Sequence, residues 1–120
     1  MSTSVGRVAE PIRVSPDACL RGDAALMRAF DLLGKRWTGV VLGALSDGPT
    51  GFRNLARAVG GISDSMLSER LGELGRAGLV TRTVSEGPPL SVTYTLTESG
   101  RALLPPLREI SRWADEHLPA

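Results

Sequence analysis

Two short helical patterns separated by a pair of glycines occupy the middle of the chain, and this feature constrains the fold most. Apolar residues recur at helical spacing over residues 51–59 and again over residues 64–77. Gly60 and Gly61 interrupt the pattern, and Ser63 is of a type favoured as the N-cap of a helix. Two short helices joined by a glycine turn predict a helix-turn-helix.

A β-hairpin is predicted directly after these helices. Residues 79–84 (LVTRTV) and 91–96 (SVTYTL) are rich in the β-branched residues that favour strands, and the SEGPPL segment between them has turn chemistry. A hairpin in this position is the wing of a winged helix-turn-helix. We therefore expect a mainly α fold with a small β-hairpin.

The N-terminal part is predicted to begin with a flexible tail over residues 1–18, because serine, glycine and proline are mixed there without an apolar period. Asp23 is suited to cap a first helix, and Gly34 is suited to end it. A second helix is expected over residues 36–45. The folded domain is therefore expected to span residues 19–120.

A long last helix is predicted over residues 98–118, with Thr97 as its N-cap and a kink at Pro105 and Pro106. A small domain does not easily cover such a long apolar stripe by itself, so we expect a homodimer contact shared with the first helix. The alternative is that the stripe packs on the core of its own chain. The residues expected at the dimer contact are Leu26, Phe30, Leu103, Leu107, Ile110, Trp113 and Ala114.

Composition favours one helical domain with a positive centre. Of the 120 residues 42% are hydrophobic but only 4% are aromatic, so the core must be mainly aliphatic. The net charge of +1 is no argument for a nucleic-acid partner, because phosphate binding needs a positive local field. Residues 35–82, however, carry seven basic and four acidic side chains, a net of +3.

An enzyme is not expected, and we predict no catalytic residue, cofactor or metal. His117 is the only histidine and has no nucleophile or metal-ligand set at a useful spacing. Cys19 is the only cysteine, so an internal disulfide or a multi-cysteine zinc site is excluded. The chain has no apolar run long enough for a membrane span and begins without a signal-peptide pattern, so we expect a cytoplasmic protein without a membrane partner.

Several motifs at fixed spacing carry a family resemblance. They are LLGKRWT, DGPTGF, GISDSMLSERLGELGRAGLVTR, the Pro-Pro pair of the hairpin and YTLTESG. With these motifs the chain from Cys19 to Trp113 resembles the HxlR family of winged helix-turn-helix transcriptional regulators. The resemblance implies N- and C-terminal dimerisation helices and a homodimer that represses or activates genes. It would bind a palindromic double-stranded DNA operator, with one recognition helix per subunit in the major groove.

The expected DNA-binding face follows from helical spacing. With the leucines of residues 64–77 turned inward, Ser65, Glu69, Gly72 and Arg76 lie on the outward line, with Ser68 beside it. Serine hydroxyls suit base edges and phosphates, and flanking arginines suit phosphates. The residues assigned to DNA are Arg36, Arg53, Arg57, Ser63, Ser65, Ser68, Glu69, Arg70, Arg76 and Arg82.

Other roles remain open for some of these residues. Glu69 either accepts from a cytosine amino group, lies on a solvated surface, or pairs with Arg70. Arg70 lies toward the core edge, where a phosphate contact or internal pairing is expected rather than direct reading of guanine. The arginines of residues 36–57 either contact phosphates or form an ordinary charged surface.

Two departures from the family pattern bear on binding. Gly72 stands where the family often has a base, and the tip of the hairpin carries Glu86 and Leu90 rather than arginine or lysine. Wing contacts to DNA are therefore expected to be weak. The alternative function is a winged helix that serves as a ligand- or protein-interaction module with weak DNA binding.

The trigger of regulation is expected at Cys19 or in a cleft. The resemblance implies that Cys19 is a redox or electrophile sensor, although Leu20 follows it where the family usually has proline. The alternative is a thiol that packs as a small hydrophobe. A small-molecule effector in a cleft between the dimerisation helices and the core is the rival trigger.

Overall fold

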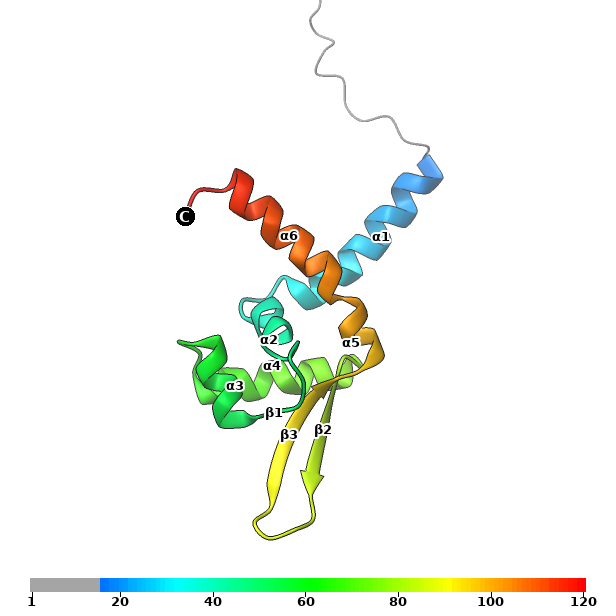
Figure 1. Cartoon of the computed structure of the whole chain (residues 1–120). Coiled ribbons are helices and arrows are strands. Elements are labelled where there is room, and N and C mark those ends of the chain that lie inside the picture. Colours follow the sequence, from blue (N-terminus) through cyan, green and yellow to red (C-terminus); the bar gives the residue numbers. More distant parts are fainter. Residues whose placement is uncertain (1–15) are drawn as a thin grey trace, which may run out of the picture. The chain divides into compact units, whose positions relative to one another are not determined.

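The computed structural model describes the backbone of residues 16–120 and the side chains of residues 24–120. Residues 1–15 of the tail expected over residues 1–18 lie outside the described residues, as does the side chain of Cys19. The chain divides into two units, Met1–Gly34 and Lys35–Ala120. Figure 1 labels their helices and strands.

The described part of the first unit is the helix α1 (Pro16–Leu33). It begins seven residues before Asp23, so the prediction that Asp23 caps it was wrong, and residues 16–18 are helical rather than tail. Proline is favoured at the start of a helix because its φ is fixed near the helical value and its missing N–H is not needed there. The predicted end is confirmed, since the Gly34 N–H donates to the Phe30 carbonyl at 2.8 Å.

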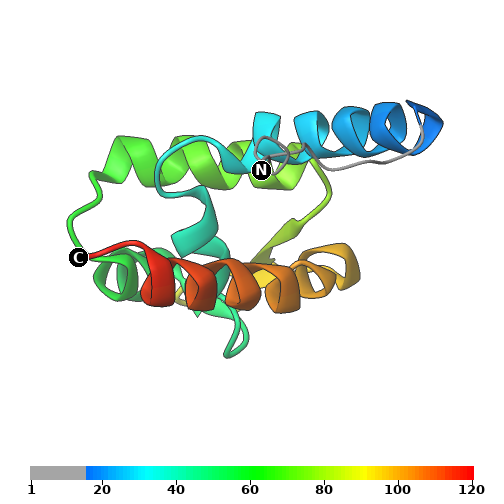
Figure 2. The same ribbon diagram turned by 90° about the horizontal axis from the view of Figure 1, so that it is seen from above.

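The second unit contains the predicted helix-turn-helix. Helix α2 (Thr38–Ala44) is followed by α3 (Phe52–Val59) and α4 (Asp64–Arg76). Helix α2 begins two residues later than predicted, because Trp37 adopts a φ of 84°, which is outside the helical region. Figure 2 shows α2 between α4 and α6 (Leu104–His117).

The core of the second unit is aliphatic, as the composition predicted. Leucines of α2, α3 and α4 interdigitate with residues from the sheet and α6. The buried apolar residues are Val41, Leu42, Leu45, Leu55, Leu67, Leu71, Leu74, Val80, Leu96 and Leu104.

The sheet has one strand more than predicted. The hairpin consists of β2 (Val80–Ser85) and β3 (Ser91–Leu96), which pair antiparallel. The two-residue strand β1 (Thr50–Gly51) pairs with β3, with Thr50 opposite Tyr94, and the strand order is β1-β3-β2. Because β1 depends on a partner more than forty residues away, its local sequence carries almost no signal for it.

The predicted last helix is two helices. Thr97 caps α5 (Glu98–Ala102) as expected, accepting from the Gly100 N–H at 3.1 Å. Pro105 and Pro106 then occupy the first turn of α6, so they begin a helix instead of kinking one. Gly100 is required at its position, because a Cβ there would lie 2.3 Å from the Leu79 carbonyl oxygen.

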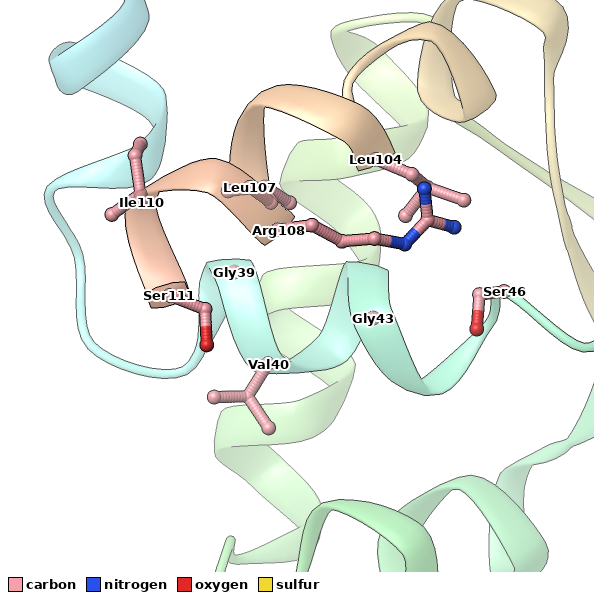
Figure 3. Close-up of a pocket in the computed structure, with 9 residues that line it drawn as sticks. All are labelled: Gly39, Val40, Gly43, Ser46, Leu104, Leu107, Arg108, Ile110 and Ser111. Atoms are coloured by element: carbon pink, nitrogen blue, oxygen red, sulfur yellow. The ribbon is translucent and has the colours of Figure 1, made fainter. Parts of the chain in front are cut away.

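Helix α6 packs across α2 and leaves an open groove beside it. The groove has a volume of about 490 Å³ and is lined by small residues of α2, including Gly39 and Gly43, and by apolar residues of α6 (Figure 3). Ile110 and Trp113 of α6 are about half exposed. Among the described residues no helix combines the length and apolar character needed to cross a membrane.

Candidate nucleic-acid interface

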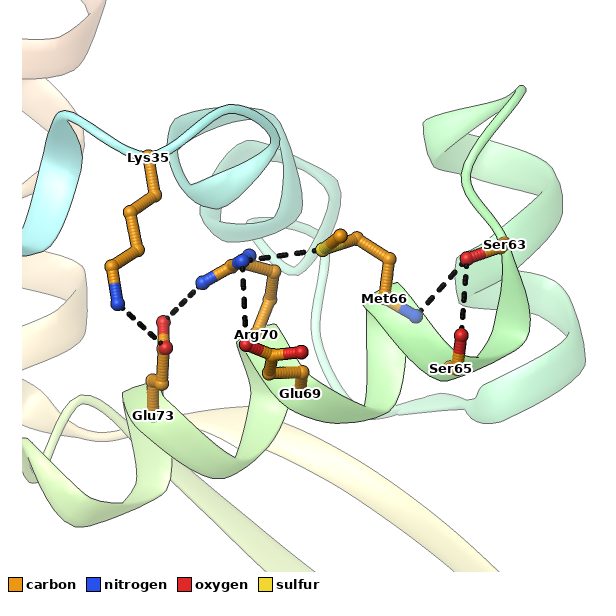
Figure 4. Close-up of polar contacts among 7 residues, drawn as sticks. All are labelled: Lys35, Ser63, Ser65, Met66, Glu69, Arg70 and Glu73. Atoms are coloured by element: carbon orange, nitrogen blue, oxygen red, sulfur yellow. Dashed lines mark hydrogen bonds and ion pairs between the residues drawn. The ribbon is translucent and has the colours of Figure 1, made fainter.

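The start of α4 is fixed by a side-chain cap. Ser63 has an extended backbone, and its hydroxyl accepts a hydrogen bond from the Met66 N–H at 3.1 Å, which confirms the predicted N-cap (Figure 4). The Ser65 hydroxyl lies 3.4 Å from the Ser63 hydroxyl. The remaining N–H groups of the first turn have no partner within the helix, so this end of α4 is suited to a phosphate.

The outward face of α4 is the one that helical spacing predicted. Leu67, Leu71 and Leu74 are buried against the core. Ser65, Ser68, Glu69 and Arg76 are exposed on the other side, and Gly72 is half-buried between them. This face therefore offers two hydroxyls, one carboxylate and one guanidinium to a partner.

Arg70 does not belong to that face, which corrects its assignment to DNA. Only 9% of its side chain is exposed, and Nη1 donates to the Glu73 Oε1 at 2.5 Å. Nη2 lies 3.6 Å from a Glu69 oxygen and 3.2 Å from the Met66 sulfur (Figure 4). Burial beside the leucines of α4 makes internal pairing the observed role, because an unpaired buried charge is costly.

Glu73 joins α4 to the segment before α2. Its other oxygen accepts from the Lys35 ammonium at 2.8 Å, so one carboxylate holds two cations (Figure 4). The hydrogen bond from Lys35 lowers the pKa of Glu73 below its ordinary value, and the bond from Arg70 adds to this effect. Sequence reasoning missed this residue. The Arg70–Glu73 spacing was a readable local signal, but the Lys35 contact spans 38 residues.

Three arginines that precede α4 in the chain are exposed, but each contacts another side chain. Arg53 pairs with Asp64 at 2.5 Å, and both side chains are more than 60% exposed. Arg57 donates to the neutral Asn54 amide oxygen at 2.5 Å. Arg36 lies in the turn before α2, not at a helix start as predicted, and its guanidinium stacks 5.1 Å from the centre of the Trp37 ring.

Arg76 and Arg82 come together although they belong to different elements. Both line a groove of about 440 Å³ between α4 and the β2–β3 hairpin, here called the α4–hairpin groove. The tip of the hairpin is different, since Leu90 is 72% exposed there and Glu86 is exposed beside it. The structure thus places the basic side chains of this region at the base of the wing.

The side chains expected at a dimer contact lie on α1 and on the α5–α6 segment. Leu26 and Phe30 of α1 are more than half exposed. On α6, Ile110 and Trp113 are exposed, whereas the remaining three expected residues are half-buried: Leu103, Leu107 and Ala114.

The described side chains hold no group of three or more histidine, cysteine, aspartate or glutamate residues that could bind a metal ion. His117 stacks on Trp113 with ring centres 5.8 Å apart, at the exposed end of α6.

Comparison with known proteins shows which family has these features. A family model described as HxlR-like helix-turn-helix matches residues 32–120. The chain is 46% identical over 88 residues to the HTH-type transcriptional regulator YodB of Bacillus subtilis, which covers 73% of this chain and 79% of that protein.

Solved structures agree with this similarity. The quinone-bound YodB from B. subtilis superposes with a TM-score of 0.67 at 41% identity, covering 78% of this chain and 98% of that chain. The redox regulator HypR in its oxidised form gives a TM-score of 0.73 at 30% identity, covering 80% and 99%. Both have the winged-helix arrangement described above.

Proposed function

Because the chain belongs to the HxlR-like helix-turn-helix family of transcriptional regulators and is not an enzyme, we propose that it binds a palindromic DNA operator as a homodimer. In this proposal each subunit inserts α4 into a major groove. The observation that carries the proposal is the outward face of α4, where Ser65, Ser68 and Glu69 are exposed at the end of a capped helix.

Base reading is assigned to the exposed polar groups of α4. The hydroxyls of Ser65 and Ser68 donate to or accept from base edges, and Glu69 accepts from a cytosine amino group. Glu69 is 59% exposed and its nearest cation, Arg70, is already held by Glu73. Only one of its oxygens lies near Arg70, at 3.6 Å, so the other is available to a partner.

Phosphate contacts are assigned to the residues around α4. In the proposed complex, Ser63 and the first N–H groups of α4 contact a phosphate at the edge of the DNA major groove. Arg57, which has only a neutral partner, and Arg36 add positive charge ahead of it. Arg53 reaches a phosphate only by giving up its pair with Asp64, so its contribution is smaller.

The dimer contact is assigned to α1 and α6. Exposed apolar side chains on both helices support this assignment, because a monomer would leave Phe30, Ile110 and Trp113 in water. Two subunits related by a two-fold axis present two copies of α4, which requires two inverted half-sites about one helical turn apart.

The trigger is assigned to oxidants or electrophiles acting on Cys19. YodB has been captured with a quinone bound, and HypR is a redox regulator with an oxidised form, so relatives of this fold respond to such chemistry. A non-covalent effector in the groove between α2 and α6 is the rival trigger, supported by its volume of about 490 Å³.

The test is binding to the DNA upstream of the protein's own gene, measured over a range of salt concentrations. We expect a footprint with two inverted half-sites. Arg57→Ala should weaken binding equally on all sequences and reduce the salt slope by about one unit per bound subunit. Arg108→Ala, which removes the same charge from α6, should leave the slope unchanged. Absence of binding at low salt would instead favour the interaction-module alternative.

A further inference from the structure

The α4–hairpin groove has a composition that its place in the fold does not require. Helix α4 contributes Ser68, Leu71, Gly72, Gly75 and Arg76 to its wall, and the sheet contributes Val80, Arg82 and Tyr94. No acidic residue lines it. Leucine and valine account for the packing of α4 against the sheet, but packing does not explain why two arginines and two hydroxyl-bearing residues line the same groove.

The two arginines in this groove are among the cations of the described residues that have no carboxylate partner. Arg53, Arg70 and Arg112 each pair with a carboxylate. Within the described part of the chain neither Arg76 nor Arg82 makes an ion pair. Their charge is therefore not neutralised by the protein, and the groove carries an uncompensated positive field.

Sheet register turns one of these arginines and a tyrosine to the same face. Arg82 of β2 lies directly opposite Tyr94 of β3 in the antiparallel pair, and side chains opposite each other share one face of a sheet. Both line the groove, so this face is the one turned to α4. Tyr94 adds a hydroxyl, which can donate a hydrogen bond, to the residues that line the groove.

Glycine on the helix side makes room for the other arginine. A Cβ built at Gly72 would lie 3.4 Å from Arg76 Nη1, so the guanidinium of Arg76 folds back over the bare backbone of α4 at that position. A Cβ alone would be in van der Waals contact with the guanidinium, and a long side chain that extends in this direction would compete with it for the same space. Gly72 therefore leaves space on α4 for the guanidinium of Arg76, which follows one turn later.

We propose that the α4–hairpin groove binds one phosphodiester group of a DNA strand, with Arg76 and Arg82 donating to the same phosphate. The proposal rests on the DNA binding proposed above and adds Gly72 and Tyr94 to the residues that serve it. Guanidinium groups suit phosphate oxygens because their N–H donors match them in pairs. Ser68 belongs both to the groove and to the outward face of α4, so the groove lies where a strand leaving that face would run.

The test is the salt dependence of binding to a fluorescently labelled duplex of random sequence, since phosphate contacts do not depend on sequence. Arg76→Ala, Arg82→Ala and the double variant are compared with the parent. The double variant should lose about one unit of salt slope per bound subunit, because the two arginines together neutralise only one phosphate. Each single variant should lose less than one unit, since the other arginine still neutralises that phosphate.

A loss of about two units per subunit in the double variant would mean separate phosphates and would overturn the proposal. An unchanged slope would overturn it as well, and would also be the result if the groove took only a free anion. Parent protein that binds no duplex at low salt would refute both this proposal and DNA binding. If the parent binds the duplex and the double variant has the same salt slope as the parent, this proposal alone is refuted.

A second variant tests the shape of the groove without changing charge. Gly72→Gln should fill the space of the Arg76 guanidinium and reduce both affinity and salt slope. The matched control is Gly43→Gln, because Gly43 is a helical glycine of α2 that lies outside this groove, and a Cβ built there has no atom within 4 Å. Equal binding by Gly72→Gln and the parent would contradict the role of Gly72.

Discussion

At the scale of single residues, Glu73 shows how the position of α4 is secured. One carboxylate accepts from Lys35 at 2.8 Å and from Arg70 at 2.5 Å, which links the residue that opens the second unit to the middle of α4. Arg70 is buried, so its charge depends on this carboxylate. The contacts of Glu73 with Lys35 and Arg70 therefore hold α4 in place, while the outward face of α4 remains open to a partner.

The first prediction concerns the pH dependence of this pair. The pKa of folded Glu73 is lowered relative to the unfolded chain, so its contribution to stability is present above the unfolded pKa and is lost as pH falls through the folded value. Glu73→Gln should lower the melting temperature at neutral pH, and the two proteins should converge in acid. Circular dichroism melts across the acidic range measure this.

The control for this prediction is Glu109→Gln. Glu109 pairs with Arg112 where both side chains are exposed, so this change should shift the melting temperature little at any pH. A difference between parent and Glu73→Gln that stays constant down to the lowest pH would show that the carboxylate charge is not the cause.

Sequence patterns predicted residues whose role is local and missed those whose role depends on distant partners. The outward position of Ser65 and Ser68 follows from helical spacing alone, and the Ser63 cap follows from its place before α4. Spacing placed Arg70 near the core edge but did not decide between phosphate and protein as its partner. That choice depends on burial and on Glu73, which three-dimensional packing determines.

At the scale of elements, glycines have opposite roles in neighbouring helices. Gly75 near the end of α4 has space around it, since a built Cβ would lie 3.8 Å from the Val80 carbonyl oxygen. Gly100 in α5 is pressed against the backbone of Leu79, where a Cβ would lie at 2.3 Å. The first glycine costs helix stability, and the second is required by a close approach.

The second prediction follows from this contrast. Gly75→Ala should raise the free energy of unfolding by up to about 1 kcal/mol, the difference in helix propensity between the two residues. Gly100→Ala should lower it by more than that amount, because backbone atoms must move apart. Urea unfolding followed by circular dichroism compares the two variants. Destabilisation by both changes would show that Gly75 is also closely packed.

Element boundaries show the same limit of sequence reasoning. The caps at Ser63 and Thr97 and the β2–β3 hairpin were predicted, because cap and turn chemistry is encoded within a few residues. Strand β1 was not predicted, because it exists only by pairing with β3. The start of α6 at Leu104 was missed because its two prolines were interpreted as a kink rather than as a first turn.

At the scale of the whole molecule, the proposed binding to an inverted operator depends on a dimer formed through α1 and α6. The third prediction is that the protein is a dimer by light scattering at micromolar concentration, and that Trp113→Glu shifts it to a monomer by placing a charge on an apolar contact. Leu90→Glu is the control, because Leu90 is also an exposed apolar side chain but lies on the hairpin tip. A parent that is monomeric would contradict the dimer.

The fourth prediction concerns the trigger. Diamide or a quinone should lower the DNA affinity of the parent, and Cys19→Ser should abolish this response while leaving binding in reducing buffer unchanged, because a thiolate is the most reactive nucleophile toward these reagents and Cys19 is the only cysteine of the chain. Binding assays with and without the reagent measure both effects. An equal response from Cys19→Ser would assign the trigger to a non-covalent effector.

The central claim is that the outward face of α4 reads DNA sequence, and discrimination between two duplexes tests it most directly. Fluorescence anisotropy would compare the parent, Ser65→Ala and Ser68→Ala on the operator and on random DNA, with Ser111→Ala of α6 as the control. We predict that the two α4 variants lose on the order of 1 kcal/mol of binding free energy on the operator and little on random DNA, and that the control loses neither. Operator binding by both α4 variants that equals the parent would contradict the claim.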